Sequence, residues 1–253
     1  MAIAFALIDY GSGQLAARKR PRYGCGGVWC ARRMANKTPA QQAYLVILAV
    51  VAWLAVGLQI WLVMQTYAAR GDSAFAAVVH TLSYFTVLTN LVVALVTTAS
   101  ATTPTVPGEL DSFLTRPGTM TAVAVYIFVV GLVYSLFLRS VWDPTGLNKV
   151  ADVALHDAVP VLYVVYWLIF VPKKNLNWTQ PFYWLIYPLA YFAYALVRGE
   201  ITGKYPYWFA DPTVLGYPRT FANSALLLIG FLVLGEVAVS VGRLRGSRDE
   251  LNP

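Results

Sequence analysis

The segment YLVILAVVAWLAVGLQIWLVMQ, residues 44–65, runs for twenty-two residues without a charged side chain. A helix needs an apolar run of about 20 residues to cross a hydrocarbon layer about 30 Å thick. A backbone inside hydrocarbon must also satisfy its hydrogen bonds within the segment, which favours a helix over an open strand. The segment therefore predicts a membrane-spanning helix.

Five more segments of this kind follow, and none alternates apolar and polar residues over about 10 positions as a barrel strand does. Of the 253 residues, 58% are hydrophobic and 12% are charged, against about 25% charged residues in soluble domains. The predicted fold class is all-α, a polytopic transmembrane bundle of six helices. The expected spans are Tyr44–Gln65, Phe75–Thr98, Thr119–Leu138, Val150–Val171, Phe182–Val197 and Thr220–Val241.

The distribution of basic residues predicts the orientation. Cytoplasmic segments near spans carry an excess of Lys and Arg, and 13 of the 19 basic residues fall on one predicted side. Both termini are therefore expected in the cytoplasm. The same distribution accounts for the net charge of +7 without a nucleic-acid partner, and the expected partners are membrane lipids. The 13 residues are Arg18, Lys19, Arg20, Arg22, Arg32, Arg33, Lys37, Arg116, Lys173, Lys174, Arg243, Arg245 and Arg248.

Three parts are expected along the chain: a basic cytoplasmic tail over residues 1–40, the six-helix domain over 41–243, and a short cytoplasmic tail over 244–253. Within the first tail, Met34 is a candidate for the native start. Cys25 and Cys30 have no His or further Cys nearby, so they cannot complete a tetrahedral zinc site. No metal cluster or phosphate loop stands out in the sequence, and we predict no metal and no cofactor.

The second predicted span carries a polar stripe. Ser83, Thr86 and Asn90 are spaced three and four residues apart and share one helical face, with Thr89 close to it. Such residues often only hydrogen-bond neighbouring transmembrane helices together. The alternative is that a hydroxyl on this face takes part in chemistry. His80 lies six residues from Thr86 on a different face, and is expected to pack or to line the interior.

The fourth predicted span carries acids and a histidine before Pro160. Asp152 and His156 are four residues apart, so the carboxylate can orient the imidazole. Together with Asp157 they could instead be interfacial polar groups. Beside the polar stripe, they suggest the pairing used in acyl transfer, an alkyl hydroxyl activated by an imidazole.

Four stretches carry a resemblance to a known family: YFTVLTNL at 84–91, LHDAVP at 155–160, Arg198-Gly199 with TGKYPY at 202–207, and LGEV at 234–237. In order and placement they resemble a bacterial family of six-span membrane proteins. That family is similar to the androgen-induced protein family, which hydrolyses fatty acid esters of hydroxy fatty acids. The resemblance implies a lipid ester substrate and a bacterial cytoplasmic (inner) membrane.

The resemblance also implies roles for single residues. Carried over, Thr86 is the nucleophile and His156 the base, while Thr89 is a rival because alignment around Asn90 needs a one-residue gap. Ser83, Asn90, Asp157 and Arg198 are candidate substrate-binding residues.

The loop Arg198–Tyr217 is either the substrate mouth or an aromatic interfacial turn. A non-catalytic protein that binds or transports a lipid or small amphiphile is the alternative function.

Overall fold

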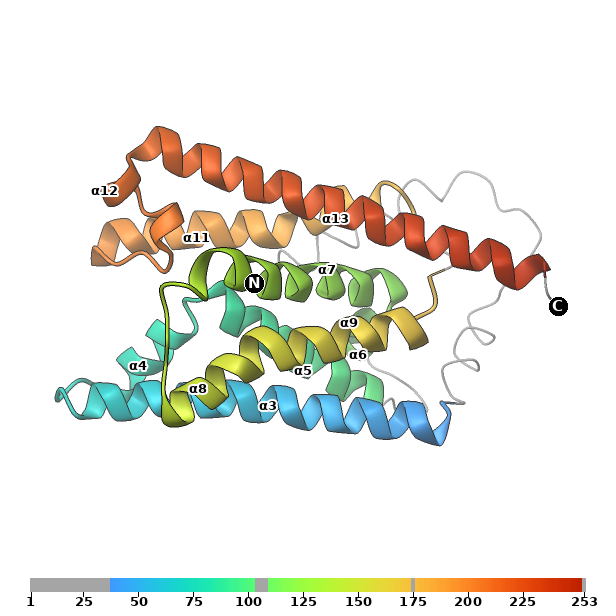
Figure 1. Cartoon of the computed structure of the whole chain (residues 1–253), viewed down its shortest axis with the longest axis horizontal. Coiled ribbons are helices and arrows are strands. Elements are labelled where there is room, and N and C mark those ends of the chain that lie inside the picture. The colour runs from blue at the N-terminus through green and yellow to red at the C-terminus, as the bar shows by residue number, and fades with distance from the viewer. Residues whose placement is uncertain (1–36, 103–108, 174–175, 252–253) are drawn as a thin grey trace. The chain divides into compact units, whose positions relative to one another are not determined.

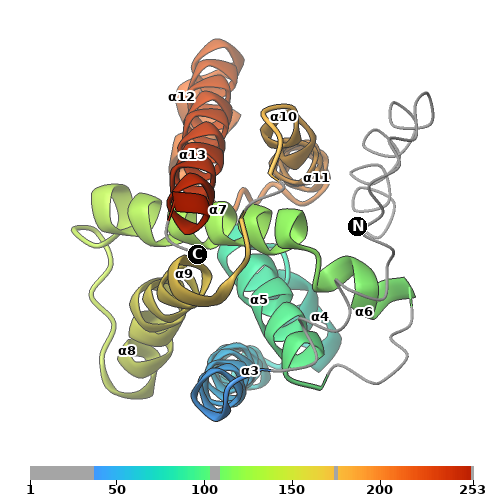
Figure 2. The same cartoon turned by 90° about the vertical axis from the view of Figure 1, so that its right-hand side faces the viewer.

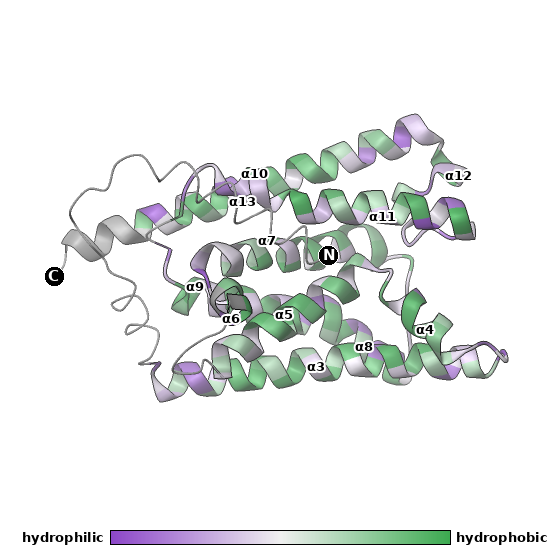
Figure 3. Ribbon diagram, turned by 180° about the vertical axis from the view of Figure 1, so that it is seen from behind, coloured by the Kyte–Doolittle hydropathy of each residue, from purple (hydrophilic) through white to green (hydrophobic). Residues whose placement is uncertain are grey.

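The computed structural model describes residues 37–102, 109–173 and 176–251, and within these ranges the chain forms helices and connections without a strand. Among the described residues, five helices are long and apolar enough to cross a membrane, at Pro39–Ala68, Phe85–Thr102, Pro117–Leu138, Gly146–Phe170 and Tyr217–Leu244. Figure 3 shows hydrophobic residues along these helices, with hydrophilic ones mostly at their ends. The expected all-α, multi-pass membrane architecture is confirmed. The tail of residues 1–36, with Cys25 and Cys30, lies outside the described residues.

The described residues fall into two compact units, one within 37–172 and the other within 173–251. In the N-terminal unit α3 packs on α5 and α9, and α7 packs on the same two helices. Figure 2 shows α3, α5 and α9 nearly end-on, with α7 running across α5 and α9. The elements of this unit are α3 (Pro39–Ala68), α4 (Ala74–Thr81), α5 (Phe85–Thr102), α6 (Glu109–Leu114), α7 (Pro117–Val133), η1 (Tyr134–Leu138), α8 (Gly146–Val153), η2 (Ala154–Ala158) and α9 (Val159–Phe170).

Local sequence signals fix the start of α3. The Thr38 hydroxyl caps the helix by accepting from the Gln41 amide at 3.2 Å, and Pro39 follows at a position where no N–H is needed. The helix is 30 residues long, so it begins before the expected Tyr44 and exceeds the length that a bilayer requires.

The expected second span, Phe75–Thr98, is not one continuous helix. It is divided between α4 and α5, with Ser83 in the turn between them. The Ser83 amide bonds the His80 carbonyl at 3.1 Å, and the Ser83 hydroxyl donates to the same carbonyl at 2.5 Å. A serine that bonds a carbonyl three residues back competes with regular helical bonding. The polar stripe therefore begins at Thr86 rather than at Ser83.

The C-terminal unit contains α10 (Gln180–Trp184), α11 (Ile186–Thr202), η3 (Trp208–Ala210), α12 (Pro212–Leu215) and α13 (Tyr217–Leu251), shown in Figure 1. The expected fifth span, Phe182–Val197, is helical but divided at Leu185, and it is not among the five helices that meet the length of a span. Pro188 offers no N–H to the Trp184 carbonyl four residues earlier, which explains the division. The predicted orientation, with both termini in the cytoplasm, stays a prediction.

A small polar cluster holds the connection that follows α11. Glu200 accepts hydrogen bonds from the Tyr205 hydroxyl, at 2.5 Å, and from the Tyr217 hydroxyl. The Tyr205 ring lies so close to Gly199 that a β-carbon there would overlap it. Gly203 ends α11 in the left-handed conformation, with φ of 66°. The connection is thus folded back onto the last turn of α11.

Replacing Gly199 with alanine is expected to destabilise this connection, because the new methyl group displaces the Tyr205 ring and its bond to Glu200. We expect a net loss of about 1–2 kcal/mol in the free energy of unfolding, the overlap outweighing the helix propensity that alanine gains. Gly230→Ala is the matched control, since nothing lies within 4 Å of its added β-carbon. Thermal unfolding of the purified variants measures the difference. Equal unfolding temperatures for Gly199→Ala and Gly230→Ala would contradict the predicted overlap with Tyr205.

The same cluster predicts a pH dependence. The hydrogen bond from Tyr205, followed by that from Tyr217, holds the pKa of Glu200 below its usual value, and the bond to Glu200 raises the pKa of Tyr205 to about 12. Stabilisation by Glu200 is complete above the usual glutamate pKa, and it is lost as the pH falls through the lowered one. Stabilisation by Tyr205 is complete below about pH 10 and is lost as the pH rises through the raised pKa.

Thermal unfolding of the wild type and of Glu200→Gln, followed against pH, checks this dependence. The variant is expected to unfold at a lower temperature near neutral pH, and the difference should vanish in acid and in strong alkali. A difference that stays constant over the whole pH range would contradict the assignment.

Candidate functional site

Several polar residues of the N-terminal unit lie close together at or beside the short π-helical turns η1 and η2. In η1 the Arg139 amide bonds the Tyr134 carbonyl five residues back at 2.9 Å. In η2 the Val159 amide bonds the Ala154 carbonyl in the same way. Pro160, the next residue, has no N–H to offer the His156 carbonyl, so the ordinary helical register cannot continue there. Such π turns within helices are frequent at functional sites.

Gly131 allows α7 to come close to η2. A β-carbon on Gly131 would lie 3.1 Å from the His156 carbonyl oxygen and 3.4 Å from Cβ of Pro160. The His156 carbonyl, to which Pro160 cannot donate, therefore lies beside the backbone of α7 at Gly131. A larger residue at position 131 would push the two elements apart.

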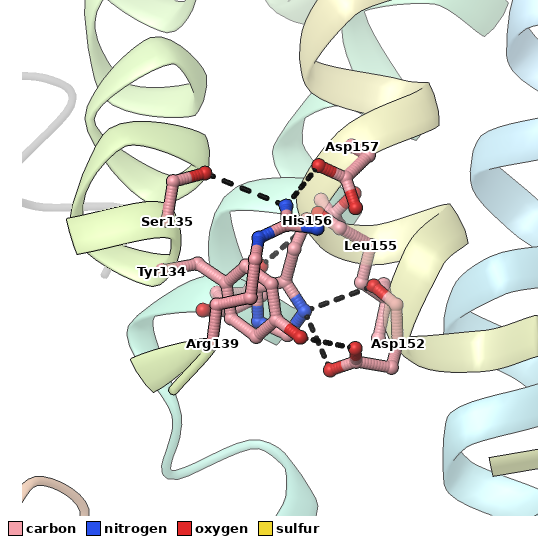
Figure 4. Close-up of polar contacts among 9 residues, drawn as sticks. Tyr134, Ser135, Arg139, Asp152, Leu155, His156 and Asp157 are labelled. Carbon is pink, nitrogen blue, oxygen red and sulfur yellow. Dashed lines mark hydrogen bonds and ion pairs between the residues drawn. The ribbon is translucent and has the colours of Figure 1, made fainter. Parts of the chain in front are cut away.

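His156 is held through one ring nitrogen. Its Nδ1 lies 2.9 Å from the Asp152 carbonyl oxygen and 3.1 Å from Asp152 Oδ1, as Figure 4 shows. A carbonyl and a carboxylate only accept hydrogen bonds, so in the neutral ring the proton belongs on Nδ1. This arrangement leaves the lone pair of Nε2 as the basic site. The predicted contact between Asp152 and His156 is confirmed.

Tyr134 completes this group, although no motif in the sequence points to it. Its ring stacks on the His156 imidazole with centroids 4.0 Å apart and planes 14° apart, and its hydroxyl donates to Asp152 Oδ2. Both carboxylate oxygens of Asp152 thus have partners, and Asp152 is buried. Tyr134 lies 18 residues before Asp152, so only the packing of α7 on η2 reveals the contact.

Arg139 and Asp157 form an ion pair beside this group. The Arg139 guanidinium also lies over the Tyr134 ring, with Cζ 4.9 Å from its centroid. About half of the Arg139 side chain is exposed, as expected near the end of a span. Asp157, predicted as a substrate-binding residue, is thus a partner of Arg139 in the structure.

The predicted nucleophile lies on α5, which packs against η2. Asn90 Nδ2 donates to the Thr86 carbonyl at 2.9 Å and to the Leu155 carbonyl at 3.1 Å. One buried amide therefore ties the turn of Thr86 to the residue beside His156. The pairing of Thr86 with His156 stays a prediction. Thr89, the rival, is fully buried, whereas Thr86 is 8% exposed.

His80 and Arg198 each contact other parts of the protein. His80 packs against the rings of Tyr67 and Tyr84, with centroids 5.6 and 5.3 Å away, as expected of a packing residue. Arg198 lies in the C-terminal unit and donates to the Lys204 carbonyl at 3.2 Å. The substrate-binding roles predicted for Ser83, Asn90, Asp157 and Arg198 stay predictions.

Comparisons of the chain with protein-family models, with curated proteins and with solved structures found no match. Over the residues that the structure describes, no three His, Cys, Asp or Glu side chains are grouped so that they could hold a metal ion.

The contacts of His156 predict its tautomer. With the ring neutral, we expect the proton on Nδ1, because both acceptors provided by Asp152 face that nitrogen. Side-chain ¹⁵N NMR of histidine-labelled protein measures this directly, and the chain has only 2 histidines to resolve. His80→Gln assigns the two sets of signals. A neutral His156 that carries its proton on Nε2 would contradict the geometry.

Proposed function

We propose that this chain is a membrane-embedded hydrolase of lipid esters, in which Thr86 is the nucleophile and His156 is the general base. The observation that carries the proposal is the double contact of Asp152 with His156 Nδ1, at 2.9 and 3.1 Å. A base oriented by a third group is the arrangement that activates a weak hydroxyl nucleophile. The resemblance in the sequence assigns the same two residues.

The placement of α5 supports the choice of hydroxyl. Asn90, one helical turn after Thr86, bonds the carbonyls of both Thr86 and Leu155. The turn of Thr86 is thus level with η2, which carries His156. Thr86 also keeps some exposure, whereas Thr89 has none, and a nucleophile must be reachable by its substrate.

The reaction follows from these roles. Nε2 of His156 takes the proton of the Thr86 hydroxyl while Oγ1 attacks the ester carbonyl carbon. The imidazolium then returns the proton to the departing alkoxide oxygen, which leaves as an alcohol, and an acyl-threonine remains. A water molecule, deprotonated by the same Nε2, attacks the acyl group, and Thr86 recovers the proton as the fatty acid leaves. Asp152 holds the imidazolium throughout.

Substitutions that preserve shape test the two roles. Thr86→Val keeps the branched side chain and removes the hydroxyl, so we expect it to abolish hydrolysis of branched fatty acid esters and labelling by a serine-type activity probe. His156→Gln is expected to lower the rate by about 10²–10⁴. Thr86→Ser retains a hydroxyl and should retain labelling. The measurement uses purified protein in neutral detergent.

Thr89→Val is the matched control, because it deletes the same hydroxyl from the same helix three residues away. We expect it to remain active. Full hydrolysis by Thr86→Val would end the assignment, and loss in Thr89→Val alone would move the nucleophile to Thr89. A wild-type protein that neither hydrolyses the esters nor takes the probe would favour the alternative, a non-catalytic protein that binds a lipid or small amphiphile.

A further inference from the structure

The guanidinium of Arg139 has hydrogen-bonding capacity that the described part of the chain does not use. It bonds Asp157 Oδ1 and, at 3.4 Å, the hydroxyl of Ser135. Both bonds leave from Nη2, as Figure 4 shows, so among the described residues Nε and Nη1 donate to none. Guanidinium has five N–H donors in a planar fork that matches the two oxygens of a carboxylate or phosphate.

The bonds already made by Arg139 are easily exchanged. The side chains of Arg139 and Asp157 are 49% and 36% exposed, and ion pairs exposed to this degree contribute little to stability. An anion with two oxygens binds through Nη2 together with Nε or Nη1. Such an anion replaces either Asp157 or the Ser135 hydroxyl, which accepts the long bond from Arg139, and the partner that it releases remains in contact with solvent.

The surroundings of Arg139 are those of a membrane boundary. It directly follows the span Pro117–Leu138. Trp142, three residues later, is 57% exposed, and aromatic side chains of this kind gather where hydrocarbon meets water. Asp143, in the same connection, forms an exposed ion pair with Lys149 near the start of α8. The headgroup of an amphiphile occupies this level of a bilayer.

Arg139 is also one side chain away from the proposed base. The Tyr134 ring contacts both groups. Its centroid is 4.0 Å from the centroid of the His156 imidazole and 4.9 Å from Cζ of Arg139. An anion held by Arg139 therefore lies beside the proposed reactive centre, and the attached chain can continue into the apolar layer.

We propose that Arg139 is the headgroup-binding residue of an anionic amphiphile, one whose carboxylate or phosphate competes with Asp157 for the guanidinium. Identifying this amphiphile with the ester substrate rests on the proposed hydrolase activity. The binding of an anionic amphiphile at Arg139 does not depend on that activity. The site differs from Arg198, the residue that the sequence pointed to, whose guanidinium bonds the Lys204 carbonyl.

Calorimetric titration of the purified protein in neutral maltoside micelles tests the site, with protein-free micelles subtracted. The probes are dodecanoate, dodecyl phosphate, the neutral dodecanol and the short anion acetate. We expect saturable binding of one or both charged amphiphiles, and much weaker binding of dodecanol and acetate. The comparison of dodecanoate with dodecyl phosphate identifies the headgroup.

Two substitutions should act in opposite directions. Arg139→Gln is expected to weaken binding about tenfold, because a charge-assisted bond is lost. Asp157→Asn is expected to strengthen binding roughly threefold, because the competing carboxylate is gone. General damage to the fold would weaken binding in both. Arg116→Gln is the matched control, since Arg116 lies over the Phe113 ring at 5.9 Å before the other end of α7, and it should bind as the wild type does.

The proposal is overturned if dodecanol binds as tightly as the charged amphiphiles, or if Arg139→Gln and Asp157→Asn leave the affinity unchanged. Binding that follows the expected pattern in a protein without ester hydrolysis would uphold the site and end the hydrolase assignment. If Arg139→Gln hydrolyses the esters as well as the wild type does and binds the anion with unchanged affinity, the hydrolase assignment stands and the Arg139 site is ruled out.

Discussion

A backbone in hydrocarbon must find its hydrogen-bond partners inside the protein, and this constraint governs the structure of the chain. Regular helices meet it in the long spans. Where the regular register fails, the freed groups find other partners close by. Between α4 and α5 the Ser83 hydroxyl bonds the His80 carbonyl in the last turn of α4. Beside Pro160 the chain changes to bonds between residues five apart. Polar side chains gather at the second of these places.

The spans could be predicted from the sequence because their burial in hydrocarbon depends only on composition and length. The segment 44–65 contains no charged residue, so it can be predicted to span the membrane without knowing which helices it packs against. The interruptions were harder to foresee. Ser83 divides a span through a bond of its own side chain, which an apolar pattern does not record. The division at Leu185 was more accessible, since Pro188 is visible in the sequence.

The candidate site was predictable only within one helix. Asp152 and His156 are four residues apart, which places them on one face, and they are in contact. Tyr134 and Arg139 each lie 18 residues before the acid that they bond. Their contacts depend on how closely α7 approaches η2, and that approach is set by Gly131. Asp157 stood out in the sequence, but its basic partner lies on another element and carries no motif.

The π turns also change how the sequence around them should be compared with others. A π turn adds about one residue to a helical turn, and each residue of an α-helix advances the face by about 100°. Residues after η2 are therefore out of phase with those before it, although Gly146–Phe170 is one span. A relative without the extra residue would align only with a gap inside a single membrane span, where gaps are rarely expected.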